Sequence, residues 1–368
     1  MNTAVKTGQR NGLIDFMKFV GIIYIAVYHW FNSGGEYFLG GKFFVEFFAI
    51  TASFSFFAKF IRAEQNHTAL DGQYYWNYIK QRFHRLFIYT FPVFIMYFTM
   101  IKVVKKEAMS FLDICESLSN TIWEILLVKM SGLNAGQGLV NGPTWYVSAL
   151  FLVEIIILGF LLWNKKWFLY TMLPLSMIIG FGYWKNLKSA SSADWLGWTS
   201  FGVLRIYLCY CTGILTWFLC QRIKKLNWTA IGRALLTVLE FAGYLTCCIM
   251  MLYPPTRNSQ YVSILLFTLS VAISFSNASY SGHLFRDCPF TRKLAQWSFS
   301  MYLTQGMIKW FFAHLPVNPL NALNKKFVLF LILVFVSGVI LNETVNWLQK
   351  KVSRLWRKWK MYLVQPED

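Results

Sequence analysis

The chain has 368 residues, with 35 Lys and Arg against 16 Asp and Glu, a formal net charge of +19. Only 14% of the residues are charged, whereas 56% are hydrophobic and 19% aromatic, and the mean hydropathy is +0.44. A soluble domain is about one quarter charged, so this composition excludes an ordinary soluble protein. Apolar stretches of about twenty residues recur along the whole chain, each long enough to cross a bilayer as a helix. We therefore predict an all-α, polytopic membrane protein.

The excess of positive charge is explained by the membrane rather than by a nucleic-acid partner. Loops on the cytoplasmic side of a membrane protein collect Lys and Arg. When the N-terminus is placed in the cytoplasm, most of the basic residues fall on that side, so we expect both termini to be cytoplasmic. The seven cysteines show no metal-ligand spacing, and we expect no metal site.

Ten transmembrane helices are predicted from the apolar stretches. They are Leu13–Phe31, Phe43–Phe60, Leu86–Met100, Thr144–Leu162, Trp167–Tyr183, Phe201–Leu219, Ala234–Leu252, Val262–Phe275, Trp297–Phe312 and Phe327–Leu348. The long loop from Ile101 to Pro143 is predicted to be outside, with a helix along the outer membrane surface. We expect residues 1–348 to form a single transmembrane domain and residues 349–368 a basic amphipathic cytoplasmic tail. That tail suits an anionic leaflet, but it is equally the ordinary basic end of a last span.

The first span, "FMKFVGIIYIAVYHW", contains Lys18 and His29, eleven residues apart. At about 100° per residue these side chains share nearly one helix face, separated by roughly 16 Å along the axis. Asp15 lies three residues before Lys18 and can pair with it. Ionisable groups within a span usually face a protein interior or a water-filled path. On the residues alone, an alternative stays open, in which Asp15 and Lys18 mark the interface and His29 reaches outward.

Charged residues recur in the second and third spans. Glu46 lies among phenylalanines in "FFVEFFAITASFSFF" and is either interfacial or a partner for a group such as His29. Arg82 and Arg85, in "YIKQRFHRLFIYTFP", lie one turn apart on one helix face and could clamp phosphate oxygens. Arginines that simply begin a span from the cytoplasm are the more common case.

Two further stretches place polar or aromatic groups in apolar helices. Trp145 and Tyr146 open the fourth span in "NGPTWYVSALFLVEI", as interfacial anchors or as a platform for substrate stacking. Ser298, Tyr302 and Gln305 recur at helical spacing in "WSFSMYLTQGMIKW" and form a polar stripe. Contact between helices explains such a stripe as well as substrate binding does.

Five pieces in this order resemble the acyltransferase 3 family, membrane enzymes that pass acyl groups, often acetyl, to sugars on exported or surface glycans. They are "IDFMKFVGIIYIAVYH", "VEFFAITASF", "RFHR" before a proline-containing span, "PTWYVSALF" and "WSFSMYLTQ". The resemblance covers the whole chain, although residues 167–276 match in hydropathy alone. Three positions depart from the usual pattern: Lys18 replaces a common arginine, Thr51-Ala52 a frequent Ser-Gly, and Gln305 a frequent histidine.

The resemblance implies a cytoplasmic acyl-CoA donor, expected to be acetyl-CoA, and a sugar hydroxyl as acceptor at the outer face. Arg82 and Arg85 would hold the CoA phosphates, and His29 would act as general base or carry the acyl group transiently. Lys18 would line the donor path with Asp15 holding it, and Glu46 would orient His29. The resemblance also implies residence in a bacterial cytoplasmic (inner) membrane.

Other functions remain open at the level of the sequence. A transporter or flippase for a glycan or lipid-linked sugar would show the same architecture and intramembrane charges. A non-catalytic sensor or assembly partner on the same fold is a third possibility. The acceptor could be a lipid-linked oligosaccharide, a surface polysaccharide, peptidoglycan or a small metabolite.

Overall fold

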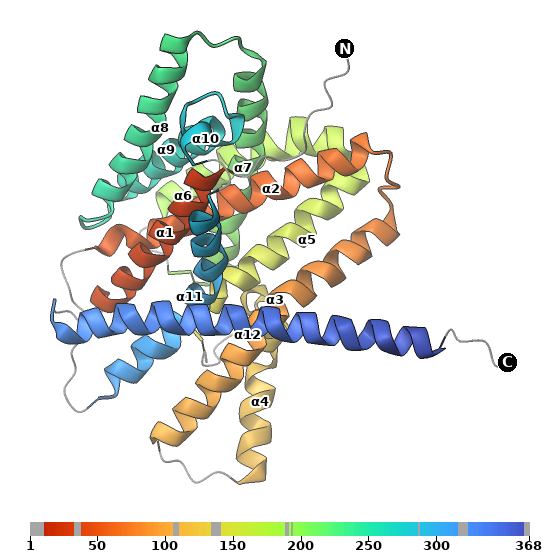
Figure 1. Cartoon of the computed structure of the whole chain (residues 1–368), viewed down its shortest axis with the longest axis vertical. Coiled ribbons are helices and arrows are strands. Elements are labelled where there is room, and N and C mark those ends of the chain that lie inside the picture. Colours follow the sequence, from red (N-terminus) through yellow and green to blue (C-terminus); the bar gives the residue numbers. More distant parts are fainter. Residues whose placement is uncertain are drawn as a thin grey trace.

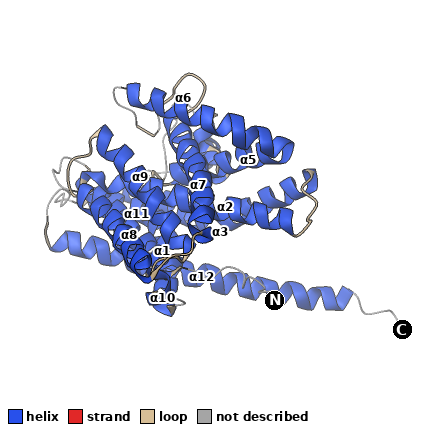
Figure 2. Cartoon of the chain, turned by 90° about the horizontal axis from the view of Figure 1, so that it is seen from above, coloured by secondary structure: helices blue, strands red, loops and turns tan. Residues whose placement is uncertain are grey.

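The structure is a computed structural model that describes residues 11–32, 38–105, 110–133, 141–187, 191–192, 194–285, 288–315 and 323–363. In these ranges the chain is built from helices and loops, and the β structure is limited to isolated bridge residues, such as the pair Trp195 and Ser200. Figures 1 and 2 show the helices gathered into one bundle from two directions. The prediction of an all-α fold is confirmed.

The α-helices of the described chain are α1 (Gly12–Phe31), α2 (Phe44–Gln65), α3 (Gly72–Lys105), α4 (Phe111–Ile125), α5 (Thr144–Trp167), α6 (Leu173–Asn186), α7 (Phe201–Lys225), α8 (Ala230–Met250), α9 (Arg257–Ser276), α10 (Ser281–Leu284), α11 (Pro289–Ala313) and α12 (Lys325–Leu363). Each of the ten predicted spans overlaps one of these helices. The helix predicted within the loop from Ile101 to Pro143 is α4.

Eight helical segments of the described chain are long and apolar enough to span a membrane, two fewer than predicted. One difference is that Thr144–Asn186 counts as one segment of 43 residues. Asn164 has a non-helical backbone (φ −156°, ψ 92°) and divides this segment in two. An unbroken helix of this length would measure about 65 Å, roughly twice the hydrocarbon thickness. The other difference is α11, which packs against α1 and α12 but is not among the eight apolar segments. Its polar stripe and its basic residues lower its hydrophobicity.

Helix α1 begins at Asn11, whose side chain caps it. Asn11 Oδ1 accepts hydrogen bonds from the backbone N–H groups of Leu13 (2.9 Å) and Ile14 (3.3 Å). Asn11 Nδ2 donates to the carbonyl oxygen of Ser274 in α9 at 2.5 Å. Asp15 lies in the first turn, where a carboxylate interacts favourably with the helix dipole. These contacts fix the start of α1, and with it the positions of Asp15 and Lys18.

The helices alternate in direction, so residues from distant parts of the sequence meet at each end of the bundle. We call the end where α1, α3 and α11 begin and α2 finishes the basic end. There the ion pair between Lys165 and Glu64 joins the end of α5 to the end of α2. At the opposite end, the backbone N–H of Phe38 donates to the carbonyl oxygen of Leu252 (3.0 Å), which joins the α1–α2 connection to α8.

Two packing groups make up most of the core. Helix α1 packs along α11, and α11 along α12, while α2 packs along α7, and α7 along α9. Large aromatic side chains such as Trp30, Phe47 and Phe267 are fully buried between them. Figure 1 shows α12 as a long helix that crosses α3 and continues toward the C-terminus. The predicted tail from 349 onward therefore continues the last helix as far as Leu363, and residues 364–368 lie outside the described residues.

Candidate active site

Two adjoining hollows lie between α1, α2, α3, α5, α11 and α12, and we call them together the arginine cavity. The first, of about 480 Å³, is lined by polar groups that include Lys59, Asn77, Gln81 and Glu154. The second, of about 450 Å³, reaches further into the bundle. Both hollows share four lining residues, namely Ala52, Ser55, Arg82 and Arg85. Because Asn77, Gln81 and Arg85 are exposed, the cavity opens at the basic end.

The second hollow brings together six of the eleven predicted site residues. They are Lys18, Arg82, Arg85, Tyr146, Ser298 and Tyr302. These residues come from α1, α3, α5 and α11, so four of the sequence motifs meet at one place. Asp15, His29, Glu46, Trp145 and Gln305 do not line this hollow.

Arg82 is held by a carboxylate that the sequence analysis did not assign. Its Nε lies 2.5 Å from Glu154 Oε2, and its Nη2 lies 2.9 Å from Oε1. The hydroxyls of Tyr78 and Tyr210 also donate to Glu154, at 3.3 and 3.0 Å. The Arg82 side chain is 19% exposed and that of Glu154 only 3%. Among the described residues Arg85 has no such carboxylate partner, and it is exposed, so the two predicted phosphate clamps differ in environment.

Lys18 and Asp15 form the predicted pair on α1. Lys18 Nζ lies 3.6 Å from Asp15 Oδ1, and Asp15 is buried while Lys18 is half-buried. The pairing at i, i+3 places the ammonium group at the wall of the arginine cavity. The prediction that Asp15 holds Lys18 is thus consistent with their geometry.

The deep end of the cavity is formed by aromatic and hydroxyl groups. The rings of Tyr146 and Tyr302 lie edge to face, with centroids 5.8 Å apart. The Tyr302 hydroxyl donates to the carbonyl oxygen of Pro143 at 2.6 Å. Ser298 donates to the carbonyl of Leu294 within its own helix. Ser298 and Tyr302 are one turn apart on α11, as the predicted polar stripe requires.

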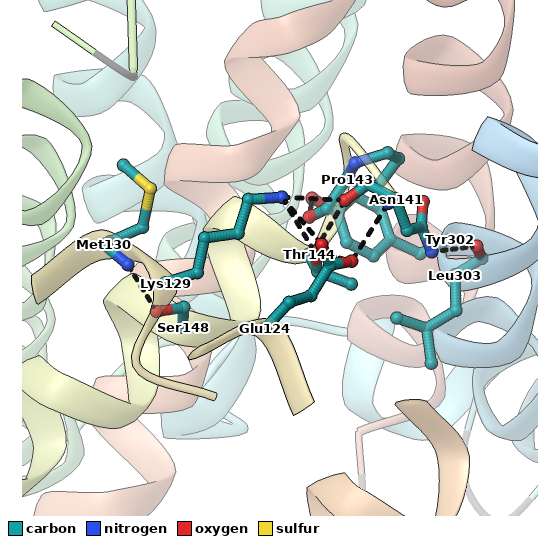
Figure 3. Close-up of polar contacts among 9 residues, drawn as sticks. All are labelled: Glu124, Lys129, Met130, Asn141, Pro143, Thr144, Ser148, Tyr302 and Leu303. Carbon is teal, nitrogen blue, oxygen red and sulfur yellow. Dashed lines mark hydrogen bonds and ion pairs between the residues drawn. The ribbon is translucent and has the colours of Figure 1, made fainter. Parts of the chain in front are cut away.

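A buried ion pair fixes the segment that begins α5 (Figure 3). Lys129 Nζ lies 3.5 Å from Glu124 Oε2 and donates to the carbonyl oxygen of Asn141 at 3.1 Å. Thr144 donates to Glu124 Oε1 at 2.9 Å, and Asn141 Nδ2 donates to the Leu303 carbonyl at 3.0 Å. The segment between α4 and α5 is thereby joined to α5 and α11, and this junction positions Tyr146 against Tyr302. Burial lowers the pKa of Lys129, and the neighbouring Glu124 opposes that shift.

Glu46 pairs with Arg205, whereas its sequence left it as an interfacial residue or as a partner for a group such as His29. Its Oε1 lies 2.6 Å from Arg205 Nη2, and it also accepts from Gln260 Nε2 at 2.6 Å. Arg205 in turn lies over the ring of Trp145, 5.8 Å from the centroid. Glu46 therefore holds the guanidinium of Arg205 against the ring of Trp145. Among the described residues, no hydrogen bond joins Glu46 to His29.

His29 lies near the opposite end of α1 and is half-buried. Its ring is close to that of Tyr28, with centroids 5.1 Å apart. Lys309 of α11 is near enough to interact with it electrostatically. Within the described chain neither His29 nor Lys309 forms an ion pair or side-chain hydrogen bond. A half-buried imidazole with both nitrogens uncommitted is able to exchange a proton with a bound hydroxyl.

Gln305 is fully buried, yet neither polar atom of its amide has a hydrogen-bond partner among the described residues. It follows Ser298 and Tyr302 on the same stripe of α11, one turn further from the basic end. The next residue, Gly306, is in tight contact with Asn141 and Pro143, since an added Cβ would lie 2.7 Å from Asn141 Oδ1. Within the described part of the chain, that oxygen also has no hydrogen-bond partner. Buried amides are rarely left unpaired, so these atoms indicate a place where a ligand or water is expected.

Sequence reasoning missed Glu154 and Arg205, the partners of Arg82 and Glu46. Each is a single charged residue inside a predicted span, and such residues generally require a partner. That signal was present in "YVSALFLVEI" and "FGVLRIYLCY", but the sequence alone could not show which residue each would meet.

The helical membrane fold and the polar cavity define an integral membrane protein with a site built inside its helix bundle. The model of the acyltransferase 3 family, described as an acyltransferase domain, matches residues 11–356. The chain belongs to this family, and the resemblance noted in its sequence is confirmed. Family membership implies an acyltransferase that works in a membrane. Comparison with curated proteins and with solved structures gives no match.

Proposed function

We propose that this chain moves an acyl group, expected to be acetyl, from acyl-CoA at the basic end to a hydroxyl of a glycan or lipid-linked sugar at the opposite end. The basic end would face the cytoplasm, in agreement with the distribution of Lys and Arg. The observation that carries the proposal is the arginine cavity. It opens beside exposed Arg85 and Lys59 and extends inward to Lys18, Tyr146 and Tyr302.

The mouth of the cavity suits the phosphates of CoA. Arg85 and Lys59 supply uncompensated positive charge to polyanionic groups. Glu154 engages Nε and Nη2 of Arg82, which leaves Nη1 as the nitrogen available to a phosphate. Arg82 thus has its orientation fixed before the donor arrives, while Arg85 is free to adapt to it. The thioester arm would extend past Lys18 toward Tyr302.

Acyl transfer then requires a base near the acceptor hydroxyl. In our proposal neutral His29 takes the hydroxyl proton while the oxygen attacks the thioester carbonyl carbon. The C–S bond breaks, the acyl group becomes an ester of the sugar, and the CoA thiolate leaves with the proton that His29 returns. Transfer through an acyl-His29 intermediate is the other route by which the same residue would act.

Three more predicted residues receive roles from their surroundings. We propose that Trp145, held over Arg205 by the Glu46 pair, provides a face for sugar stacking at the opposite end. Gln305 lies between the cavity and the level of His29 along α11. Its unpaired amide would donate to the carbonyl oxygen of the thioester as charge develops there.

The test is acyl transfer by purified protein in nanodiscs, supplied with acetyl-labelled acetyl-CoA and glycans extracted from the host surface. We expect loss of the thioester and appearance of label as an alkali-sensitive ester on a glycan. The His29→Ala variant should have a normal denaturation midpoint and transfer no label to glycan. A normally folded His29→Ala protein that retains full transfer would contradict the mechanism. Failure of every glycan fraction to accept label, with donor intact, would contradict the proposed function.

A further inference from the structure

A second cavity, separate from the arginine cavity, is lined by residues of α3 and α12. Figure 1 shows α12 crossing α3. It has a volume of about 730 Å³, larger than either hollow of the arginine cavity. We call it the α3–α12 groove. None of its lining residues, all of them in the described chain, is acidic. The proposed transfer reaction makes no use of it.

The groove has an apolar part and a cationic part, arranged along both helices in the same sense. On α3, His84 comes first, followed by Phe87 and Phe91 toward the middle of the bundle. On α12, which runs the other way, Leu348 comes first and Arg354 lies toward the basic end. The imidazole of His84 and the charged groups of Lys350 and Arg354 therefore lie toward one end of the groove. Phe87, Phe91 and Leu348 lie toward the other, and the groove extends over about 12 to 14 Å for eight or nine residues of helix.

The cationic part is exposed and has no carboxylate partner in the described chain. Lys350 and Arg354 are one turn apart on α12 and both are exposed, as is His84 on the facing helix. Basic side chains that directly follow the apolar part of a membrane-spanning helix lie near the membrane surface, where anionic lipid headgroups attract them. Apolar side chains such as Phe91 and Leu348, 37% and 45% exposed, continue the groove toward the hydrocarbon region.

We propose that the α3–α12 groove is a binding site for an anionic phospholipid. The phosphate would lie against Lys350 and Arg354, and an acyl chain would lie along Phe87, Phe91 and Leu348. Charge complementarity selects an anionic headgroup, and the apolar part selects a lipid over a free phosphate. A zwitterionic lipid would satisfy the apolar part alone.

The groove shares a wall with the arginine cavity. Asn346 lines both, and the Tyr89 hydroxyl lies 3.4 Å from the side-chain oxygens of Asn342 and Asn346. A bound lipid would therefore pack against the outer side of the wall that encloses the arginine cavity.

The test is native mass spectrometry of the full chain released from phosphatidylcholine nanodiscs that contain a minor fraction of phosphatidylglycerol. We expect retained phosphatidylglycerol on the wild-type protein. The Lys350→Ala/Arg354→Ala variant should lower its apparent affinity about 25- to 30-fold, from about a fivefold contribution of each basic residue at an anionic surface. A charge-neutral change, Leu348→Trp, should also displace the lipid, because it fills the apolar part of the groove.

The matched control removes two exposed lysines from the end of α7, in the variant Lys224→Ala/Lys225→Ala. It should retain phosphatidylglycerol as the wild type does. Equal loss in this control would show general charge attraction and overturn the proposal, as would equal retention of phosphatidylcholine. Unchanged binding by both groove variants would overturn it as well. All of these results are independent of acyl transfer.

Discussion

Arg82 and Glu154, 72 residues apart in the sequence, form a two-point ion pair at the wall of the arginine cavity. Glu154 is almost completely buried and also accepts hydrogen bonds from Tyr78 and Tyr210. Arg82 thus forms a structural ion pair and also lines the arginine cavity, whereas its neighbour Arg85 is exposed. This difference allows their roles to be separated by experiment.

Loss of the Glu154 carboxylate should destabilise the protein. Glu154→Leu leaves the guanidinium of Arg82 largely buried without its partner, at a cost of about 3 kcal/mol or more. The double variant Glu154→Leu/Arg82→Met should recover most of that loss, because no charge then remains buried. Denaturation midpoints in a single detergent would measure both effects. A double variant no more stable than Glu154→Leu would show that the pair is not what holds these helices.

Arg85→Ala should leave the stability of the protein unchanged and weaken its binding of the acyl donor. The side chain is exposed at the mouth of the arginine cavity, so its removal leaves no buried group unpaired. We expect KM for acetyl-CoA to rise about tenfold, which corresponds to one charge-assisted contact with phosphate. S-acetylpantetheine, which lacks the nucleotide phosphates, should be used equally by the variant and the wild type. The exposed residue Lys80 lies outside the residues that line the cavity, and Lys80→Ala provides a control of the same charge change. An equal loss with both donors would exclude a phosphate contact for Arg85.

The helices and the convergence of motifs could be predicted from the sequence for a physical reason. A bilayer requires apolar stretches of a fixed length, so each predicted span overlaps a helix even where its ends differ. Motifs that lie at the same depth on successive spans then come together when the helices pack. Lys18, Arg85 and Tyr302 meet in one cavity in this way.

The partners of the buried charges could not be predicted. Glu46 was expected near His29 because both lie near the same membrane face, but depth does not specify direction around a helix. Packing of α2 against α7 instead brings Arg205 to Glu46, 159 residues away. The same limit applies to Glu124 and Lys129, whose pairing depends on how the segment between α4 and α5 folds back onto α5.

His29→Asn should slow turnover strongly without weakening the binding of the acyl donor. Asparagine is polar and smaller than histidine but has no basic nitrogen, so proton transfer from the acceptor is lost. We expect kcat to fall about 10²- to 10⁴-fold, the usual contribution of a general base, while KM for acetyl-CoA stays the same. Steady-state thiol release measures both constants. The neighbouring residue offers a comparison, since Lys309→Gln removes the nearby charge and leaves the imidazole in place. A larger loss for Lys309→Gln than for His29→Asn would assign the central role to the lysine.

Gln305→Met should make the protein more stable and less active. Methionine has nearly the shape of glutamine but no amide, so the substitution removes two buried polar atoms that have no partner in the ranges that the structure describes. Such groups cost about 1 to 3 kcal/mol each to bury unpaired, and the denaturation midpoint should rise. If the amide donates to the thioester carbonyl in the transition state, kcat should fall about 10²- to 10³-fold, as it does on loss of an oxyanion donor. Gln305→Glu keeps the shape and replaces the amide N–H groups with a carboxyl group that donates only when it is protonated, and it should lose activity without gaining stability. A methionine variant that is less stable and fully active would mean that the amide has a structural partner and no part in the reaction.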